Sequence, residues 1–107
     1  MVTTKRTPGP IVRALHEVGA HLRTWRKLND LTVAAVAQRA NVSADTVQRM
    51  ENGQGVSLEN ALRVVRVLGL LDAVVASLDP MNTDVGRLRA EQKLPRRVRR
   101  VNAQVQS

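Results

Sequence analysis

Two short segments, residues 33–40 and 44–52, carry the apolar spacing of helices and are separated by only three residues. Thr32 and Ser43 stand directly before them, and both residue types cap the first turn of a helix. Asn41 lies between the segments and tolerates the left-handed backbone conformation that a tight turn needs. The pattern therefore predicts two short helices joined by a tight turn.

The interior of such a helix pair requires small or apolar side chains at fixed positions. Ala37 is small enough for the two helices to cross closely, and Asn52 with Gly53 ends the second helix. The wedge between the helices is filled by four apolar residues: Val36, Val42, Val47 and Met50. All of these positions are filled suitably and at the correct spacing, which makes the pattern specific.

A longer helix is expected before this pair, starting near Pro10 and ending near residues 29–30. Its apolar residues follow steps of three and four and share one helical face: Ile11, Leu15, Val18, Leu22, Trp25 and Leu28. Trp25 is the only aromatic residue of the chain, and we expect it in the core. Gly19 lies inside the run and should weaken the helix by about 1 kcal/mol relative to Ala.

Three further helices are expected after the pair. Ser57 caps the first of them, and Gly69 separates it from an apolar helix over residues 70–78. A short helix over 84–92 follows. The inward residues of the helix that Ser57 caps are Leu58, Ala61, Leu62, Val65 and Leu68. No segment alternates as a strand over more than a few residues, so the predicted fold class is all-α.

The positive charge lies mainly toward the two ends of the chain. The net charge is +8, with six basic and two acidic residues in 1–30 and seven basic and two acidic residues in 81–107. We therefore divide the chain into a basic flexible arm (1–10), a helical domain (11–79) and a basic C-terminal extension (80–107). A small basic protein favours polyanionic partners, and nucleic acid is the first of them.

Composition also argues against several classes of protein. The chain has no cysteine, which excludes disulfides, thiolate zinc sites and cysteine nucleophiles. No apolar run has the length of a membrane span, and the N-terminus lacks the apolar stretch of a secretory signal. His16 and His21 point in different directions on a helix, and no catalytic constellation stands out. We expect a cytoplasmic, nucleoid-associated protein that is not an enzyme, has no cofactor or metal and does not bind membranes.

A series of short motifs covers about residues 20–70. They are Leu31-Thr32, Val36-Ala37, Ala40-Asn41-Val42-Ser43, Thr46-Val47, Arg49-Met50-Glu51-Asn52-Gly53, Ser57-Leu58 and Leu68-Gly69. Together they resemble the Xre/Cro-repressor family of helix-turn-helix proteins, with the motif at 33–52. The resemblance implies a five-helix bundle of the lambda-repressor-like DNA-binding type. Its third helix, here 44–52, would enter the DNA major groove.

The resemblance assigns base contacts to the outward residues of this recognition helix: Ala44, Asp45, Gln48 and Arg49. Arg49 is the foremost candidate, because its fork fits the guanine acceptors N7 and O6. Gln48 would reach adenine or a phosphate, and Ala44 offers a methyl contact. Asp45 either accepts from a cytosine amine or pairs with Arg49 one helical turn away, and we prefer the pair.

Phosphate contacts are expected from helix N-termini and short polar side chains. The candidates are Thr32, Val33 (through its backbone amide), Thr46, Asn52, Gln54 and Ser57. Most members of the resembled family carry Gln where this chain has Val33, and that side chain clamps a phosphate. The departure removes one expected contact, so the basic ends of the chain would supply more of the affinity.

Arg26 and Glu51 occupy positions that form a partly buried ion pair in similar proteins. The pair would tie the first helix to the end of the recognition helix. We expect its role to be structural.

The helix over residues 70–78 is more apolar than a monomer needs. Its predicted dimer interface consists of Leu70, Leu71, Val74, Val75 and Leu78. Dimerisation would place two recognition helices one DNA turn apart, roughly 34 Å. We therefore expect a homodimer on a palindromic operator of double-stranded DNA.

The C-terminal extension contains Thr83-Asp84-Val85-Gly86, Arg87-Leu88-Arg89 and Leu94-Pro95-Arg96-Arg97-Val98-Arg99. It resembles the extension of HipB-like regulators, which are antitoxins of HipA-like kinase toxins. A basic tail that adds phosphate affinity and a minor-groove arm are alternatives. The chain is thus expected to be a dimeric autorepressor or an antitoxin that binds a kinase-like toxin. An RNA-binding role is disfavoured by the shortage of stacking aromatics.

Overall fold

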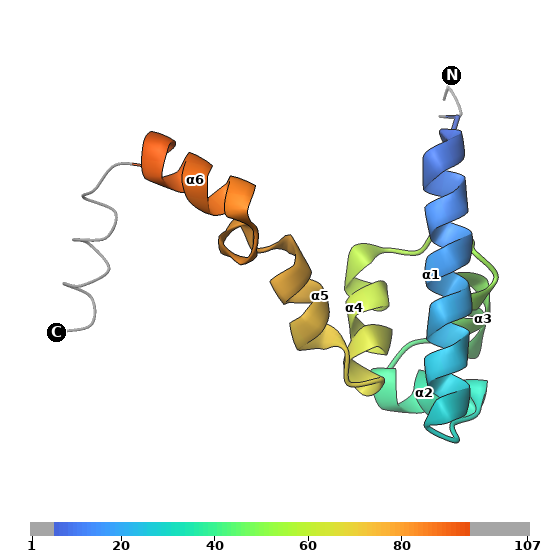
Figure 1. The fold of residues 1–107 in the computed structure, drawn as a ribbon. Coiled ribbons are helices and arrows are strands. Elements are labelled where there is room, and N and C mark those ends of the chain that lie inside the picture. The colour runs from blue at the N-terminus through green and yellow to red at the C-terminus, as the bar shows by residue number, and fades with distance from the viewer. Residues whose placement is uncertain (1–5, 95–107) are drawn as a thin grey trace, which may run out of the picture. The chain divides into compact units, whose positions relative to one another are not determined.

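A computed structural model of the chain describes residues 6–94, and Figure 1 shows its helices. The helices are α1 (Gly9–Leu28), α2 (Val33–Ala40), α3 (Ala44–Glu51), α4 (Leu58–Val67), α5 (Leu71–Leu78), the 3-10 helix η1 (Pro80–Asn82) and α6 (Asp84–Lys93). No strand occurs within residues 6–94, so the all-α prediction is confirmed for this part of the chain. The first half of the predicted arm and the predicted basic tail from residue 95 lie outside the described residues.

Local capping explains where the central helices begin and end. The side-chain oxygens of Thr32 and Ser43 accept hydrogen bonds from the backbone N–H groups of Ala35 and Thr46, both at 3.0 Å. Asn41 ends α2 with a φ of 57°, and Gly53 follows α3 with a φ of 82°. Both values lie in the left-handed region, as the sequence predicts for the turn and the stop.

The core lies among α1, α2, α3 and α4. In Figure 1, α3 lies beside α1, and α2 packs against both α3 and α4. The buried apolar residues are Leu22, Val36, Ala37, Ala40, Val47, Met50, Val64, Val65 and Leu68. Val36 and Val47 are each only 1% exposed, in agreement with the predicted wedge between the two short helices.

The packed face of α1 differs from the predicted one. Trp25 is 43% exposed, which makes its prediction as a core residue wrong. The other exposed members of the predicted apolar face are Ile11, Val18 and Leu28. The residues of α1 that are buried or half-buried are Leu15, Gly19, Leu22 and Arg26, which follow steps of four, three and four. Leu15 and Leu22 belong to both faces. The close approach of Gly19 to α3 and the ion pair of Arg26 with Glu51 complete the packed face in place of Val18 and Trp25.

The chain divides into two compact units, Met1–Leu71 and Asp72–Ser107. The first unit holds α1 to α4. None of the residues of α5 is buried. Leu58, predicted to face inward from α4, is 73% exposed.

The described part of the second unit is held together by short-range contacts. Thr83 caps α6 by accepting from the Gly86 N–H at 2.9 Å. Arg87 pairs with Asp84 and donates to the Met81 carbonyl at 2.8 Å. No residue of η1 or α6 is buried. Among the described helices, none is both long and apolar enough to cross a membrane.

Candidate nucleic-acid interface

Helix α3 has one buried and one exposed face. Val47 and Met50 are buried, whereas Ala44, Asp45, Gln48 and Arg49 are all exposed. The structure therefore places the four predicted base-contacting residues on the accessible face of α3. A helix that is fixed on one side and polar on the other is suited to insertion into a groove.

Arg49 interacts with the loop that follows α3. Its Nη2 donates to the Gly55 carbonyl oxygen at 3.0 Å. The predicted pair between Arg49 and Asp45 is not formed, because the guanidinium reaches forward to the loop; the ion pairs within residues 6–94 do not involve Asp45. One hydrogen bond uses one of the five guanidinium N–H groups, so Arg49 retains donors for a second partner.

The three predicted phosphate-contacting residues that carry a hydroxyl either cap a helix or contact a capping residue. Thr32 and Ser57 accept from the backbone N–H groups at the starts of α2 and α4, and Thr46 shares a hydrogen bond with Ser43. A hydroxyl that accepts a backbone N–H keeps its own hydrogen for another acceptor, such as a phosphate. Gln54 is exposed and Val33 is half-exposed.

Glu51 links α1 to the end of α3 through two arginines. Arg26 Nε donates to its Oε2 at 2.7 Å, and Arg23 Nε donates to its Oε1 at 3.3 Å. The Glu51 side chain is 6% exposed and the Arg26 side chain 14% exposed. Arg26 also donates to the Leu31 carbonyl at 3.0 Å and so holds the turn between α1 and α2. The pair between Arg26 and Glu51 is the one that the family resemblance implies.

Arg23 was not singled out from the sequence, although it lies one turn before Arg26 on the same helix. Its Nη2 donates to the side-chain oxygen of Asn52 at 2.9 Å. The spacing of three residues between two arginines is the signal that could have pointed to it, because such residues share a helix face.

The remaining feature that the sequence did not reveal is the close contact at Gly19. A β-carbon at Gly19 would lie 2.6 Å from the Glu51 carbonyl oxygen and closer still to that of Met50. Glycine is therefore required for α1 and α3 to approach each other, and this contact fixes the position of the C-terminal end of α3.

The comparisons with known proteins agree with this geometry. A family model described as a helix-turn-helix domain matches residues 17–78, which is more than half of the chain. The chain therefore belongs to the helix-turn-helix domain family, and this membership supports DNA as its partner and a role in transcription regulation. Neither the search of curated proteins nor the search of solved structures found a significant match.

Proposed function

We propose that this protein is a sequence-specific regulator of transcription of the Xre/Cro-repressor type, which inserts α3 into the major groove of double-stranded DNA. The observation that carries the proposal is the two-sided character of α3. Its inner face is fixed by Val47 and Met50 in the core, and its outer face presents Gln48 and Arg49 to solvent. Arg and Gln are side chains that form bidentate hydrogen bonds with guanine and adenine.

The surroundings of α3 support this mode of binding. The N-termini of α2, α3 and α4 are capped by Thr32, Ser43 and Ser57. Thr32 and Ser57 accept from backbone N–H groups and keep their hydroxyl hydrogens for another acceptor. Backbone N–H groups and short polar side chains of this kind position a protein on the phosphates without reading sequence. Specificity is thereby assigned to α3, and orientation to the helix starts around it.

The protein acts as a homodimer in this proposal, with α5 as the interface. Val75 and Leu78 are 59% and 80% exposed, and Leu70, Leu71 and Val74 are half-buried. Two copies joined through these side chains would bind a palindromic operator. The regulator would act in the cytoplasm, on the nucleoid, and would repress its own promoter.

Selection from a random double-stranded DNA library with the full chain tests the proposal. The expected product is a two-fold symmetric site with half-sites one helical turn apart, roughly 34 Å. The DNA upstream of its own coding sequence should contain such a site and give a specific band shift at physiological salt. Recovery of unenriched sequences, with equal affinity for all duplexes, would contradict sequence-specific binding.

A second candidate function, that of an antitoxin bound to a HipA-like kinase toxin, is favoured by the second unit. None of its described residues is buried, and a set of large apolar side chains is exposed: Val75, Leu78, Met81, Val85, Leu88 and Leu94. Such an exposed apolar surface is typical of a protein interface. Co-purification with the product of the adjacent gene tests this role, and a neighbour without a kinase-like fold would exclude it.

A further inference from the structure

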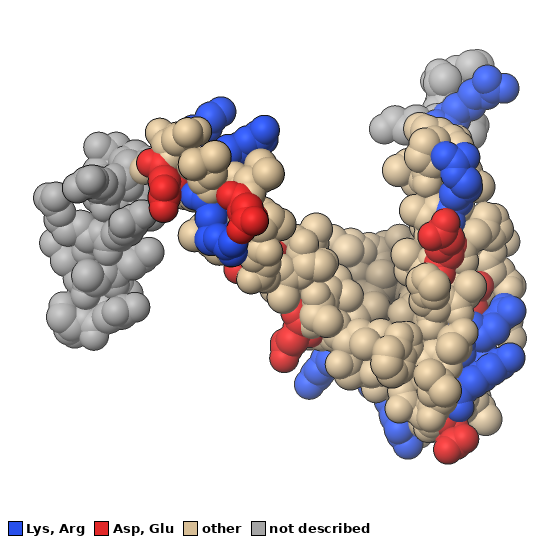
Figure 2. All heavy atoms as spheres, in the orientation of Figure 1, with Lys and Arg blue, Asp and Glu red and all other residues tan. Residues whose placement is uncertain are grey.

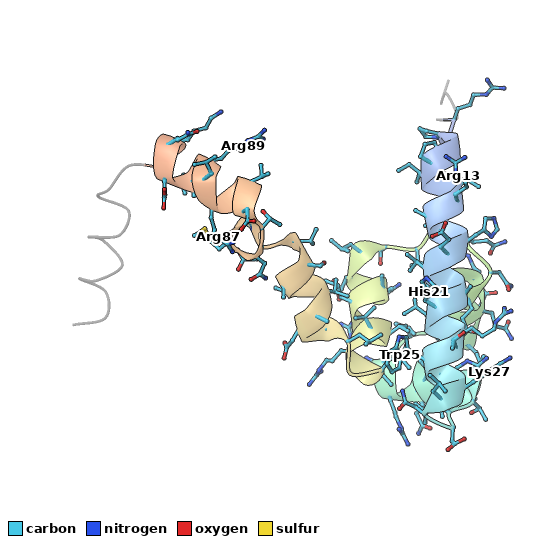
Figure 3. All side chains as sticks on the ribbon, in the orientation of Figure 1. Arg13, His21, Trp25, Lys27, Arg87 and Arg89 are labelled. Atoms are coloured by element: carbon cyan, nitrogen blue, oxygen red, sulfur yellow. The ribbon has the colours of Figure 1, made fainter. Side chains whose placement is uncertain are left out.

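A hollow of about 310 Å³ lies where α1 meets the start of α2 and the end of α3. Its lining comes from all three helices and comprises Arg23, Arg26, Lys27, Val33, Gln48, Glu51 and Asn52. Lys27 and Trp25 project from opposite sides of α1 (Figure 3), so the hollow lies away from the exposed tryptophan. In Figure 2, Lys and Arg side chains gather along the same edge of α1.

The lining of this hollow carries an excess of positive charge. Three cationic side chains surround a single carboxylate, that of Glu51, which is nearly buried. Arg26 is largely buried beside Glu51, and its guanidinium is occupied by the carboxylate and the Leu31 carbonyl. Arg23, at 44% side-chain exposure, and Lys27, which is exposed and has no ion-pair partner within residues 6–94, remain open to a ligand.

Hydrogen bonding makes the mouth of the hollow rich in donors. Arg23 has no acceptor atom, so its contact with Asn52 occupies the Asn52 side-chain oxygen. The Nδ2 amino group of Asn52 is then the free end of that amide. The guanidinium of Arg23, the ammonium of Lys27 and this amino group are all donors. A phosphate group, which has only acceptor oxygens and a negative charge, is complementary to this set.

We infer that this hollow binds one phosphate group of the DNA backbone, through Arg23 and Lys27. Glu51 acts as the positioning residue, because its carboxylate accepts a hydrogen bond from Arg23 and so orients that guanidinium. The negative charge of Glu51 is balanced by its second partner, Arg26. Val33 lines the hollow without a polar side-chain atom, and the two cations of α1 supply the contact. The inference rests on the proposed DNA binding and assigns part of its affinity to α1.

The test uses the full chain and fluorescence anisotropy on two duplexes, the selected site and an unrelated sequence, over a series of KCl concentrations. We expect Lys27→Ala and Arg23→Ala to weaken binding to both duplexes alike, by roughly tenfold each at moderate salt. The ratio of the two affinities should stay unchanged, because phosphate contacts carry no sequence information. Arg66→Ala is the matched control: it removes an exposed arginine of α4 that lies outside this hollow and should leave both affinities unchanged.

The number of phosphates follows from the salt dependence. Neutralising one phosphate contributes about 0.9 to the slope of log K against log salt. If both side chains contact the same phosphate, the double variant should reduce the magnitude of that slope by no more than about one. A loss of about two would place the side chains on separate phosphates and overturn the single site.

A backbone substitution identifies the ligand directly. In this experiment a single DNA phosphate at a time is replaced by a neutral methylphosphonate. At one position per half-site, the replacement should weaken binding of the wild-type protein. At that same position it should cause no further loss of affinity in the Arg23→Ala, Lys27→Ala double variant. Saturable inhibition by inorganic phosphate at constant ionic strength would instead assign the hollow to a free anion. Lys27→Ala, which removes no ion pair, keeps the test informative if Arg23→Ala unfolds the protein.

The outcome separates this inference from the proposed function. If Arg23→Ala and Lys27→Ala both bind DNA as Arg66→Ala does, and the selected site is still preferred, the hollow does not bind a phosphate. The proposed function as a transcription regulator is then unaffected. If the wild-type chain shows no preference for any duplex, the proposed function fails first.

Discussion

Gly19 of α1 lies directly against the backbone of Glu51 at the end of α3. A β-carbon on Gly19 would lie 2.6 Å from the Glu51 carbonyl oxygen, a separation that no packed side chain tolerates. The contact allows α1 and α3 to cross at backbone distance. It also brings Arg23 and Arg26, one and two turns further along α1, within reach of the Glu51 carboxylate.

Gly19→Ala should destabilise the protein, although Ala favours an exposed helix by about 1 kcal/mol. The added methyl group meets backbone rather than a movable side chain, so we expect a loss of about 1–3 kcal/mol in the free energy of unfolding. Urea unfolding followed by circular dichroism measures it. Gly55→Ala is the control, because a β-carbon there meets open space. Equal stabilities of the two variants would show that the helices do not cross this closely.

Glu51→Gln should lower the free energy of unfolding by about 3 kcal/mol, because it leaves the buried Arg26 guanidinium without its counter-charge. The matched control is Glu59→Gln. Glu59 pairs with Arg63 one turn away on α4, and both side chains are well exposed. The control should change stability by no more than about 0.5 kcal/mol. Similar losses of unfolding free energy in the two variants would mean that the buried position of Glu51 does not make its ion pair more important for stability than an exposed one.

Arg49→Ala should reduce discrimination between the selected DNA site and a site with a substituted guanine, by roughly 1–3 kcal/mol. Competition binding with single-base variants of the site measures the change. Arg49→Lys keeps the charge without the fork and should lose most of the same discrimination. A uniform loss of affinity for all sequences would instead show that Arg49 acts only through its hydrogen bond to Gly55.

Val33→Gln should raise the affinity for DNA about fivefold, because the resembled family uses a glutamine at this position to clamp a phosphate. Val33 is half-exposed at the first position of α2, so the longer side chain has room to reach outward. Val33→Leu is the control for size and should not increase affinity. Titration by fluorescence anisotropy compares the three proteins, and an unchanged or weaker affinity of the glutamine variant would contradict the assignment.

Leu78→Glu should dissociate the proposed dimer without unfolding the first unit, because Leu78 is 80% exposed in α5. Sedimentation velocity would then report a monomer, and affinity for a palindromic site should fall more than affinity for a half-site. Leu88→Glu in α6 introduces the same charge at an exposed leucine outside the predicted interface. A wild-type chain that sediments as a monomer at micromolar concentration would remove the basis for the dimer.

The elements that the sequence predicted correctly are those determined by a few neighbouring residues. Thr32, Ser43 and Ser57 cap helices as expected, and Asn41 adopts the left-handed turn. The small residue Ala37 and three of the four wedge residues, Val36, Val47 and Met50, are buried, whereas Val42 is half-buried. Each of these outcomes depends on hydrogen bonds or packing within about twenty residues, so the residue types and their spacing suffice to predict them.

The candidate site was predictable in part. The exposed face of α3 follows from helical periodicity, and the family resemblance supplied the pairing of Arg26 with Glu51. The hydrogen bond from Arg49 to Gly55 and the contact of Arg23 with Asn52 were not predictable. They depend on where a long flexible side chain finds its acceptor, which periodicity does not specify.

The sequence by itself therefore determined the helices, their caps and the turn, because these are local. Only the tertiary structure decided which face of α1 is packed. Periodicity favoured a face in which Leu22 is flanked by Val18 and Trp25. The fit of Gly19 against the backbone of α3 and the charge of Glu51 selected a face in which Leu22 is flanked by Gly19 and Arg26. The physical reason is that burial depends on the shape and charge of the surface that a helix meets, and that surface is contributed by residues about thirty positions away in the chain.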